Sequence, residues 1–244
     1  MLLILMYHRV HEAGRIPDAL DVHLRYLRDH HPLVLPGDAL LHGSVNVCLT
    51  FDDATVDFRS QVFPLLETLD CRALVAVPTG YILANTGDSL DRRLAAQQAV
   101  VMGGGYSTMG SPLCTWQELH EMQDSGRVLC ASHSHSHADM SAPDTDVRGE
   151  LARSSAALRQ HLGQAPSTFV YPYGRTRRDI QAQVGRRFRY AMRIGSAVNT
   201  DWSGNGGLLY RVDAEHFWPE GKVWSFTDAM RWQIKYLANR LRGK

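Results

Sequence analysis

Seven short apolar runs, separated by segments with helical spacing, constrain the fold of this chain most strongly. The runs are mostly continuous in their apolar character, which is typical of strands buried on both faces of a parallel sheet. They cover residues 2–7, 45–51, 71–77, 127–132, 168–172, 189–194 and 208–213. Because strands that alternate with helices favour parallel pairing, we predict one α/β domain, a distorted (β/α) barrel with about seven parallel strands. An open doubly wound sheet is the structural alternative.

The segments between the runs carry the periodicity of amphipathic helices. Leucines recur at helical spacing over residues 20–27. Thr115 and Glu118 form the pattern of a capping box at a helix start, and Gly163 is a typical helix stop. We therefore predict helices outside the strands, including a long one over residues 144–162.

The tail of the chain, from Ser225 onward, has a helical pattern of its own. Met230, Ile234 and Leu237 form an apolar stripe with basic residues beside it. We interpret the basic side of this helix as a solvated face.

Residues 80–114 are the one long irregular stretch of the sequence. They include the glycine-rich segment 102–110, which neither follows a strand nor carries a lysine followed by serine or threonine. This segment is therefore not a phosphate-binding loop, and we expect a flexible lid or a surface loop.

The composition is that of an ordinary globular protein, with 244 residues of which 44% are hydrophobic and 21% charged. The net charge of +1 gives no indication of a nucleic-acid partner. No run approaches the roughly 20 apolar residues of a membrane helix, so we predict no transmembrane segment. The apolar N-terminal run lacks the features of a signal peptide, and we expect a buried strand and a cytoplasmic protein. Removal of a leader would leave the same N-terminus.

Polar residues follow four of the predicted strands at the point where each strand ends. Tyr7 and His8 end the first run, and Asp52 and Asp53 follow the second. Three histidines alternate with serines after the fourth run, and the segment Tyr-Pro-Tyr-Gly at 171–174 ends the fifth. Chemistry in sheets of this class lies at the C-terminal strand ends, so we expect these residues to gather there.

His133 and His137 have the spacing of two metal ligands. Residues four apart lie on the same face of a helical turn, so both imidazoles can reach one cation, whereas His135 points elsewhere. Two histidines and one carboxylate suit zinc, and also iron, cobalt or nickel. One aspartate of the Asp52 and Asp53 pair would then ligate the cation, and the other would stay free as a base. Taken alone, the histidine spacing can be incidental and the aspartates can form a turn or a helix cap.

These motifs together resemble the polysaccharide deacetylases, the NodB-homology domain of carbohydrate esterase family 4. The matching segments are LMYHRV, LTFDDATVDF, SHSHSHADM and FVYPYGRTRRDI, and the resemblance covers roughly residues 2–213. The Tyr-Pro-Tyr-Gly version of the third motif is similar to that of deacetylases of poly-N-acetylglucosamine and related exopolysaccharides. The resemblance implies a single catalytic domain over residues 1–244, with a barrel of parallel strands and helices outside.

The resemblance also implies roles for individual residues. Asp52 is similar to the catalytic base, and Asp53, His133 and His137 to the three ligands of one divalent metal, with zinc as the first choice. Tyr171, Pro172 and Tyr173 match the substrate-binding motif, in which the residue at Tyr173 lines the groove and its backbone N–H helps to hold the oxyanion. The implied reaction is metal-assisted hydrolysis of an acetamido group of an N-acetylated sugar or glycan, with release of acetate.

Three departures from the family pattern affect this interpretation. Ala54 stands where the family usually has glycine, which is tolerable only if the turn needs no positive φ. The arginine of the usual third motif is absent, as in the Tyr-Pro-Tyr-Gly subgroup. The family's late Leu-x-His motif, which supplies the general acid, has no clear match. His216 lies in the right region, but we favour His8 because it lies at a strand end.

Two other functions compete with a sugar N-deacetylase. A hydrolase of non-sugar amides on the same fold would have a closed pocket instead of an open groove. A non-catalytic relative would bind a glycan without releasing acetate. Trp218, Trp224 and residues 80–114 would shape specificity or form an interface, so homo-oligomerisation stays open.

Overall fold

The computed structural model describes residues 1–8, 10, 18–99, 105–215 and 224–241. Its centre is a closed barrel in which each strand pairs in parallel with the next, and β7 closes the ring on β1 through Leu5 and Val212. The strands are β1 Leu2–Tyr7, β2 Asn46–Phe51, β3 Ala73–Val77, β4 Val128–Ser132, β5 Thr168–Val170, β6 Tyr190–Ile194 and β7 Leu208–Asp213. This confirms the predicted barrel of parallel strands and excludes the open sheet.

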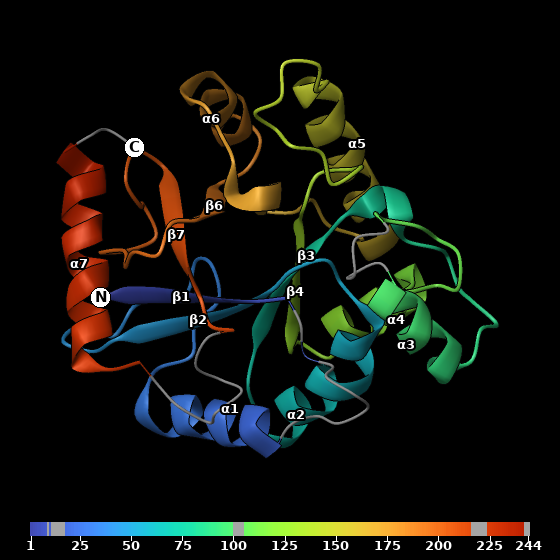
Figure 1. The fold of residues 1–244 in the computed structure, drawn as a ribbon, viewed down its shortest axis with the longest axis horizontal. Coiled ribbons are helices and arrows are strands. Elements are labelled where there is room, and N and C mark those ends of the chain that lie inside the picture. Colours follow the sequence, from blue (N-terminus) through green and yellow to red (C-terminus); the bar gives the residue numbers. More distant parts are fainter. Residues whose placement is uncertain (9, 11–17, 100–104, 216–223, 242–244) are drawn as a thin grey trace.

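Helices cover the outside of the barrel, as Figure 1 shows. A π-helical turn at Phe58–Val62 leads into α2, and short 3₁₀ turns lie at Thr79–Tyr81 and Pro172–Gly174. The helices are α1 Asp18–His30, α2 Phe63–Thr68, α3 Leu90–Ala99, α4 Trp116–Asp124, α5 Val147–Leu162, α6 Arg178–Gly185 and α7 Phe226–Leu241.

The side-chain alternation along each strand decides what fills the barrel. Leu209 of β7 and Cys48 of β2 belong to one buried apolar cluster with residues of the neighbouring strands. Alternate residues of a strand point to the same side, so Arg211 lies on the same side of β7 as Leu209. By the same rule, the side chains of Thr50 and Asp52 point into the barrel interior, as that of Cys48 does. The interior is therefore apolar at the N-terminal end and polar at the C-terminal end.

Two of the predicted helix boundaries are confirmed. Thr115 accepts a hydrogen bond from the backbone N–H of Glu118, whose carboxylate accepts from the backbone N–H of Thr115, which is a complete capping box for α4. Gly163 ends α5 with a φ of 77°, a conformation that costs glycine little. The long helix α5 begins after Asp146, slightly later than expected.

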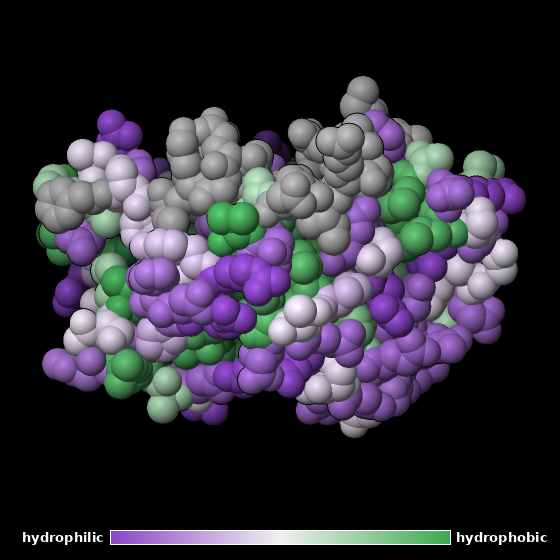
Figure 2. Space-filling model, turned by 90° about the horizontal axis from the view of Figure 1, so that it is seen from below, coloured by the Kyte–Doolittle hydropathy of each residue, from purple (hydrophilic) through white to green (hydrophobic). Residues whose placement is uncertain are grey.

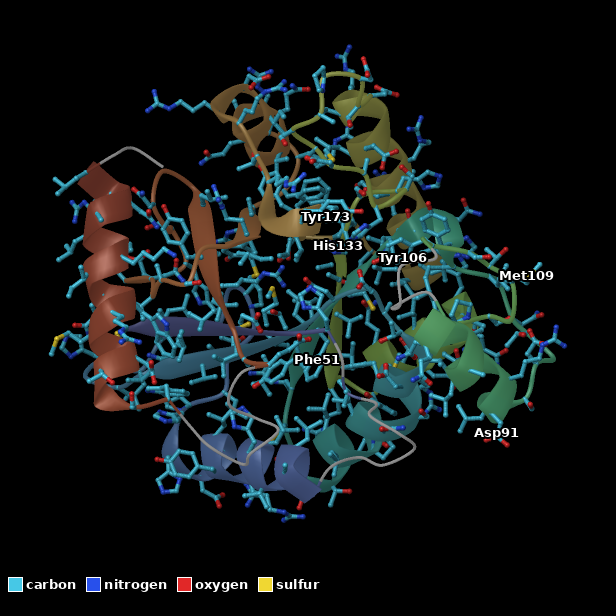
Figure 3. The ribbon with its side chains drawn as sticks, in the orientation of Figure 1. Phe51, Asp91, Tyr106, Met109, His133 and Tyr173 are labelled. Carbon is cyan, nitrogen blue, oxygen red and sulfur yellow. The ribbon has the colours of Figure 1, made fainter. Side chains whose placement is uncertain are left out.

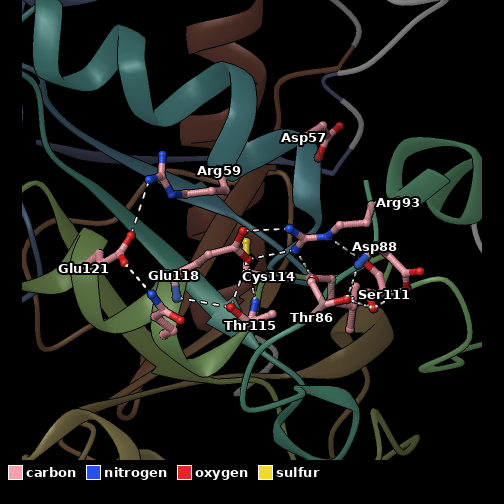
Figure 4. A network of polar contacts seen from close by, with 12 residues as sticks. Asp57, Arg59, Thr86, Asp88, Arg93, Ser111, Cys114, Thr115, Glu118 and Glu121 are labelled. Carbon is pink, nitrogen blue, oxygen red and sulfur yellow. Dashed lines mark hydrogen bonds and ion pairs between the residues drawn. The ribbon is translucent and has the colours of Figure 1, made fainter. Parts of the chain in front are cut away.

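Residues 80–114 differ from the irregular stretch that we expected, because they contain α3. The guanidinium of Arg93 is buried, and it contacts both carboxylate oxygens of Glu118 at 2.7 and 2.8 Å. Arg93 also donates to the backbone carbonyls of Ser111 and Leu113 (Figure 4). The sequence pattern did not predict this helix because its buried positions, Arg93 and Gln97, are polar, so it has no apolar periodicity. Residues 102–104 of the glycine-rich segment lie outside the described part of the chain.

The surface seen from the side of α1 and α2 is mostly hydrophilic, with smaller apolar areas between the polar side chains (Figure 2). None of the helices in the described ranges combines the length and the apolar content that crossing a bilayer requires.

Candidate active site and metal centre

The C-terminal ends of β1, β2, β4 and β5 bring together most of the polar residues that the sequence analysis singled out. Asp52 and Asp53 follow β2, and the histidine segment follows β4. Figure 3 shows His133, Tyr106 and Tyr173 close to one another at this end of the strands. A parallel barrel places all its C-terminal strand ends on one rim, which explains why segments so distant in sequence meet.

Asp53, His133 and His137 form a group with the geometry of a metal site. The Oδ1 atom of Asp53 lies 3.5 Å from Nε2 of His133 and 3.5 Å from Nε2 of His137. The three potential ligand atoms all lie within 4.8 Å of one another. This spacing leaves room for one cation between them, and the set of one carboxylate and two imidazoles is typical of zinc and related metals.

The hydrogen bonds of the two histidines use Nδ1 of each ring and leave Nε2 available to bind a cation. Nδ1 of His133 lies 2.8 Å from the carbonyl oxygen of Val170, which can only accept, so Nδ1 carries the proton. Nδ1 of His137 lies 3.2 Å from the hydroxyl of Tyr173. Burial lowers the pKa of each imidazole to about 4, so both are neutral at neutral pH. Neutral imidazoles with a fixed tautomer are the form that ligates metals.

Asp53 provides the test of whether a cation fits this place. Its Oδ1 atom is buried and has no hydrogen-bond partner, although a buried carboxylate oxygen is costly unless it is paired. Burial raises the pKa of Asp53 above its usual range. A cation between Oδ1 and the two Nε2 atoms would supply the missing partner, so the residues fit a divalent metal.

The backbone that carries the two histidines is not the helical turn that their spacing predicted. Residues 133–137 form an irregular bend, in which Ser134 and His137 have positive φ values of 62° and 53°. The carboxylate of Glu150 in α5 accepts the backbone N–H groups of His135 and Ser136, both at 2.8 Å. Glu150 thus replaces the helical hydrogen bonds and fixes the bend. His135 points away from the trio, as predicted, and its Nδ1 lies 3.1 Å from the Thr79 hydroxyl.

The turn after β2 does require positive φ, at 72° for Asp53 and 52° for Ala54. This is the conformation that would make alanine a strained substitute for the family glycine. The methyl group of Ala54 is fully buried in the main apolar core, which offsets part of that strain.

Arg211 of β7 holds Asp52 in place inside the barrel, with β1 lying between their two strands. Its two terminal nitrogens contact the two carboxylate oxygens of Asp52 at 2.6 and 2.8 Å, and one of them also contacts the Thr50 hydroxyl at 3.2 Å. Both Arg211 and Asp52 are buried. Burial alone would raise the pKa of Asp52, but the charge of Arg211 and the hydrogen bond from His8 hold it well below its usual range. Asp52 is therefore ionised at neutral pH.

His8 lies between two carboxylates at the end of β1. Its Nε2 is 3.3 Å from Oδ2 of Asp52, and its Nδ1 is 3.5 Å from Oε1 of Glu215. Glu215 also accepts the backbone N–H of His8 at 2.8 Å, which fixes the segment. Burial works to lower the pKa of His8, but its hydrogen bonds to Asp52 and Glu215 outweigh burial and raise it to about 10. The imidazole is thus protonated at neutral pH, next to the ionised Asp52.

The Tyr-Pro-Tyr-Gly segment contributes less to the rim than expected. Tyr171 is fully buried and packs edge-on against Phe169, and Pro172 is also buried, so neither side chain lines a groove. The side chain of Tyr173 is 56% exposed and contacts the ring of His137. The two buried residues place Tyr173, which has a positive φ of 57°.

Two further tyrosines stand beside Tyr173. The ring of Tyr106 lies 4.4 Å from that of His137 and 5.1 Å from that of Tyr81, measured between centroids. The Tyr106 hydroxyl interacts with the carboxylate of Asp53 and works against burial to lower the pKa of that carboxyl. Residues 80–114 therefore supply an aromatic wall for the histidine and aspartate trio.

Some residues of the candidate site were not predicted from the sequence, and two residues that were predicted lie outside the described part of the chain. Arg211 had a signal, because an arginine within an apolar run such as LLYRVD is unusual in a buried strand. Glu215, Tyr106 and Glu150 had no such signal, since a lone acid or tyrosine in a loop or helix is commonplace. His216 and Trp218, which we had considered for general acid and specificity, fall outside the described residues.

The comparison with protein families decides the classification. The family model described as polysaccharide deacetylase matches residues 42–192, more than half of the chain. The chain belongs to the polysaccharide deacetylase family. The match includes Asp52, Asp53, His133, His137 and the Tyr-Pro-Tyr-Gly segment. It leaves out β1 and β7, which supply His8 and Arg211 to this deacetylase-family site. No curated protein matches the chain.

Solved structures similar to this member of the polysaccharide deacetylase family show the same fold. The deacetylase PplD of Streptococcus pyogenes, solved in complex with acetate, is 22% identical, with a TM-score of 0.69 over 90% of this chain and 95% of that one. IcaB from Ammonifex degensii is 24% identical, with a TM-score of 0.67 over 90% and 94%. A de-N-acetylase from Aggregatibacter actinomycetemcomitans is 17% identical, with a TM-score of 0.67 over 95% and 99%.

Proposed function

We propose that this chain hydrolyses the acetamido group of an N-acetylated sugar, in a surface polysaccharide or its precursor. Water and the amide are consumed, and acetate and a free amine are formed. One observation carries the proposal: the trio of Asp53, His133 and His137 lies beside an ionised carboxylate and a protonated imidazole. Membership of the polysaccharide deacetylase family supports the same class of reaction.

Asp53, His133 and His137 would hold one divalent cation, zinc by preference, with cobalt, nickel and iron as alternatives. When bound, such a cation polarises a carbonyl group and lowers the pKa of water. The unpartnered Oδ1 of Asp53 and the two free Nε2 atoms support this assignment.

Asp52 would take the proton from the attacking water. Arg211 keeps its carboxylate ionised and fixes both oxygens, so the group is oriented before the substrate arrives. His8 would then give its proton to the leaving amine nitrogen. Because Nε2 of His8 is 3.3 Å from Oδ2 of Asp52, the proton taken from water can pass back to His8 and restore both groups.

Tyr173 would contact the sugar. It is the exposed residue of its motif, and an aromatic ring on a rim offers an apolar face to a sugar. Its positive φ is unusual for tyrosine, and such backbone conformations gather at functional sites. We assign to its backbone N–H the contact with the oxyanion of the tetrahedral intermediate. A solved structure of this fold is named a de-N-acetylase, which supports the choice of an N-acetyl group.

Three expectations from the sequence stay predictions. They are a single catalytic domain over residues 1–244, His216 as an alternative general acid, and a cytoplasmic location.

The test measures acetate release from oligomers of N-acetylglucosamine, from oligomers of N-acetylgalactosamine and from non-sugar amides. Wild type should release acetate from at least one of the oligomers, and Asp52→Asn should lose activity by about a hundredfold or more. Asp201→Asn, which changes an exposed aspartate, is the matched control and should keep full activity. Acetate release from non-sugar amides alone would show that the substrate is not a sugar. No acetate release from any of the tested compounds would favour a non-catalytic relative.

A further inference from the structure

The outward face of α7 is apolar, although nothing among the described residues covers it. Met230, Ile234, Leu237 and Leu241 are 45%, 60%, 56% and 90% exposed. Their spacing of four, three and four residues places them in one line along the helix. Other large exposed apolar side chains in the described ranges, such as Val22, Leu41 and Met109, are scattered over different elements. We call these four residues the α7 stripe.

The α7 stripe is not the face that attaches the helix to the barrel. Trp232 and Tyr236 do that, because both are partly buried and pack against the main apolar core. Gln233 also reaches Met1, at the N-terminal end of β1. The helix therefore has one apolar face toward the barrel and a second, the α7 stripe, on its outer side, where Leu237 also borders a hollow that it shares with Met1 and Val198.

Basic residues stand beside the α7 stripe. Residues 225–244 contain five basic side chains and one acidic side chain, a net charge of +4, while the whole chain has +1. The rest of the chain is therefore net negative. On α7 itself, Arg231 and Arg240 border the stripe on opposite sides, with Lys235 beyond Arg231. The acid, Asp228, accepts hydrogen bonds from Ser225 and lies 3.9 Å from Arg231.

We propose that α7 docks this protein on an anionic membrane surface, with the α7 stripe in the apolar boundary and the basic side chains among lipid headgroups. An exposed apolar line bordered by cations is the pattern of helices that lie in the membrane interface. A second copy of the chain fits less well, because symmetric pairing through the stripe would bring cation-bordered surfaces together. Anionic headgroups neutralise these same charges.

The position of α7 makes this docking compatible with an open catalytic rim. The helix lies at the N-terminal end of β1, whereas His133, Tyr106 and Tyr173 lie at the C-terminal strand ends (Figure 3). Docking through the α7 stripe leaves the rim turned away from the bilayer and accessible to a polymer.

The test is flotation of the full chain with vesicles. Wild type should float with vesicles of phosphatidylcholine and phosphatidylglycerol, should stay behind with phosphatidylcholine alone, and should be released by salt. The variants Ile234→Ser with Leu237→Ser, and Arg231→Glu with Lys235→Glu, should each bind about tenfold more weakly or worse. Leu41→Ser, at a similarly exposed position away from α7, is the matched control and should bind like wild type.

Thermal unfolding of every variant should match wild type, because all the changed side chains are exposed. The proposal is overturned if wild type does not float, or if the variants that change α7 float as well as Leu41→Ser. Light scattering tests the alternative that a second copy of the chain covers the α7 stripe. If wild type is a dimer that does not bind vesicles, and the variant Ile234→Ser with Leu237→Ser is a monomer, the stripe is a dimer interface.

Discussion

The two terminal nitrogens of Arg211 hold the two carboxylate oxygens of Asp52, at 2.6 and 2.8 Å, across 159 positions of sequence. Both side chains are buried, and both point into the barrel from β7 and from the end of β2. The pair exists because the barrel closes, and it lies next to the trio of Asp53, His133 and His137. It keeps the carboxylate beside the candidate metal site ionised and holds it in one orientation.

Replacing Arg211 with methionine should destabilise the protein by about 3–5 kcal/mol, because it removes the bidentate partner of the buried Asp52 charge and leaves only His8 beside it. Denaturant unfolding measures this change in the free energy of unfolding. The control is Arg25→Met, which breaks an exposed pair with Asp21 on α1 and should cost less than about 1 kcal/mol. If Arg211→Met lowers the free energy of unfolding no more than Arg25→Met does, the buried ion pair does not stabilise the fold. If Arg211→Met does not fold, Arg211→Met with Asp52→Asn should recover folding, since it removes both charges.

His133 and His137 should begin to lose the metal only as the pH falls toward about 4, and any loss of affinity at a higher pH should come from protonation of Asp53, whose pKa is raised by burial. Protons compete with the cation only when they bind its ligands, and the pKa values of the free His133 and His137 are lowered to about 4 by burial. Exposed histidines, with a pKa near 6.5, would lose affinity already between about pH 7 and 6. Titration of the metal-free protein with zinc at a series of pH values distinguishes these two outcomes.

Glu215→Gln should move the alkaline limit of activity to lower pH. The carboxylate of Glu215 helps to raise the pKa of His8 to about 10, so its removal lowers that pKa and deprotonates the acid earlier as pH rises. The pH profile of kcat/KM measures the shift, with Glu121→Gln on α4 as the control. An unchanged alkaline limit in Glu215→Gln would mean that His8 is not the acid.

Tyr106→Phe should weaken metal binding by roughly tenfold, because partners of a ligand commonly contribute that much. The change removes only the hydroxyl that interacts with Asp53 and keeps the ring against His137. Titration with zinc compares it with Tyr26→Phe, an exposed tyrosine on α1. Equal affinities in the two variants would assign Tyr106 a role in packing alone.

The sequence was sufficient to predict the barrel and much of its rim. Continuous apolar runs of strand length carry the topology, and Asp52, Asp53, His133 and His137 directly follow such runs. Such patterns can be recognised from neighbouring residues alone, without knowledge of contacts between distant segments. The structure brings those residues together with His8, as the strand-end argument predicted.

What the sequence could not predict depends on contacts between distant segments. Arg211 meets Asp52 only because β7 closes on β1, and no local pattern encodes that closure. The bend of the histidine segment depends on Glu150 from another helix. The burial of Tyr171 follows from its packing on Phe169, whereas its motif had suggested a groove.

The most direct test of the central claim is the metal content of the purified protein together with acetate release, in wild type and in His133→Ala. His120→Ala, an exposed histidine on α4, is the matched control. We predict about one divalent metal per chain in wild type and in His120→Ala, with loss of both metal and acetate release in His133→Ala. Absence of metal from wild type when zinc is supplied, or equal metal content in His133→Ala, would contradict the site described here.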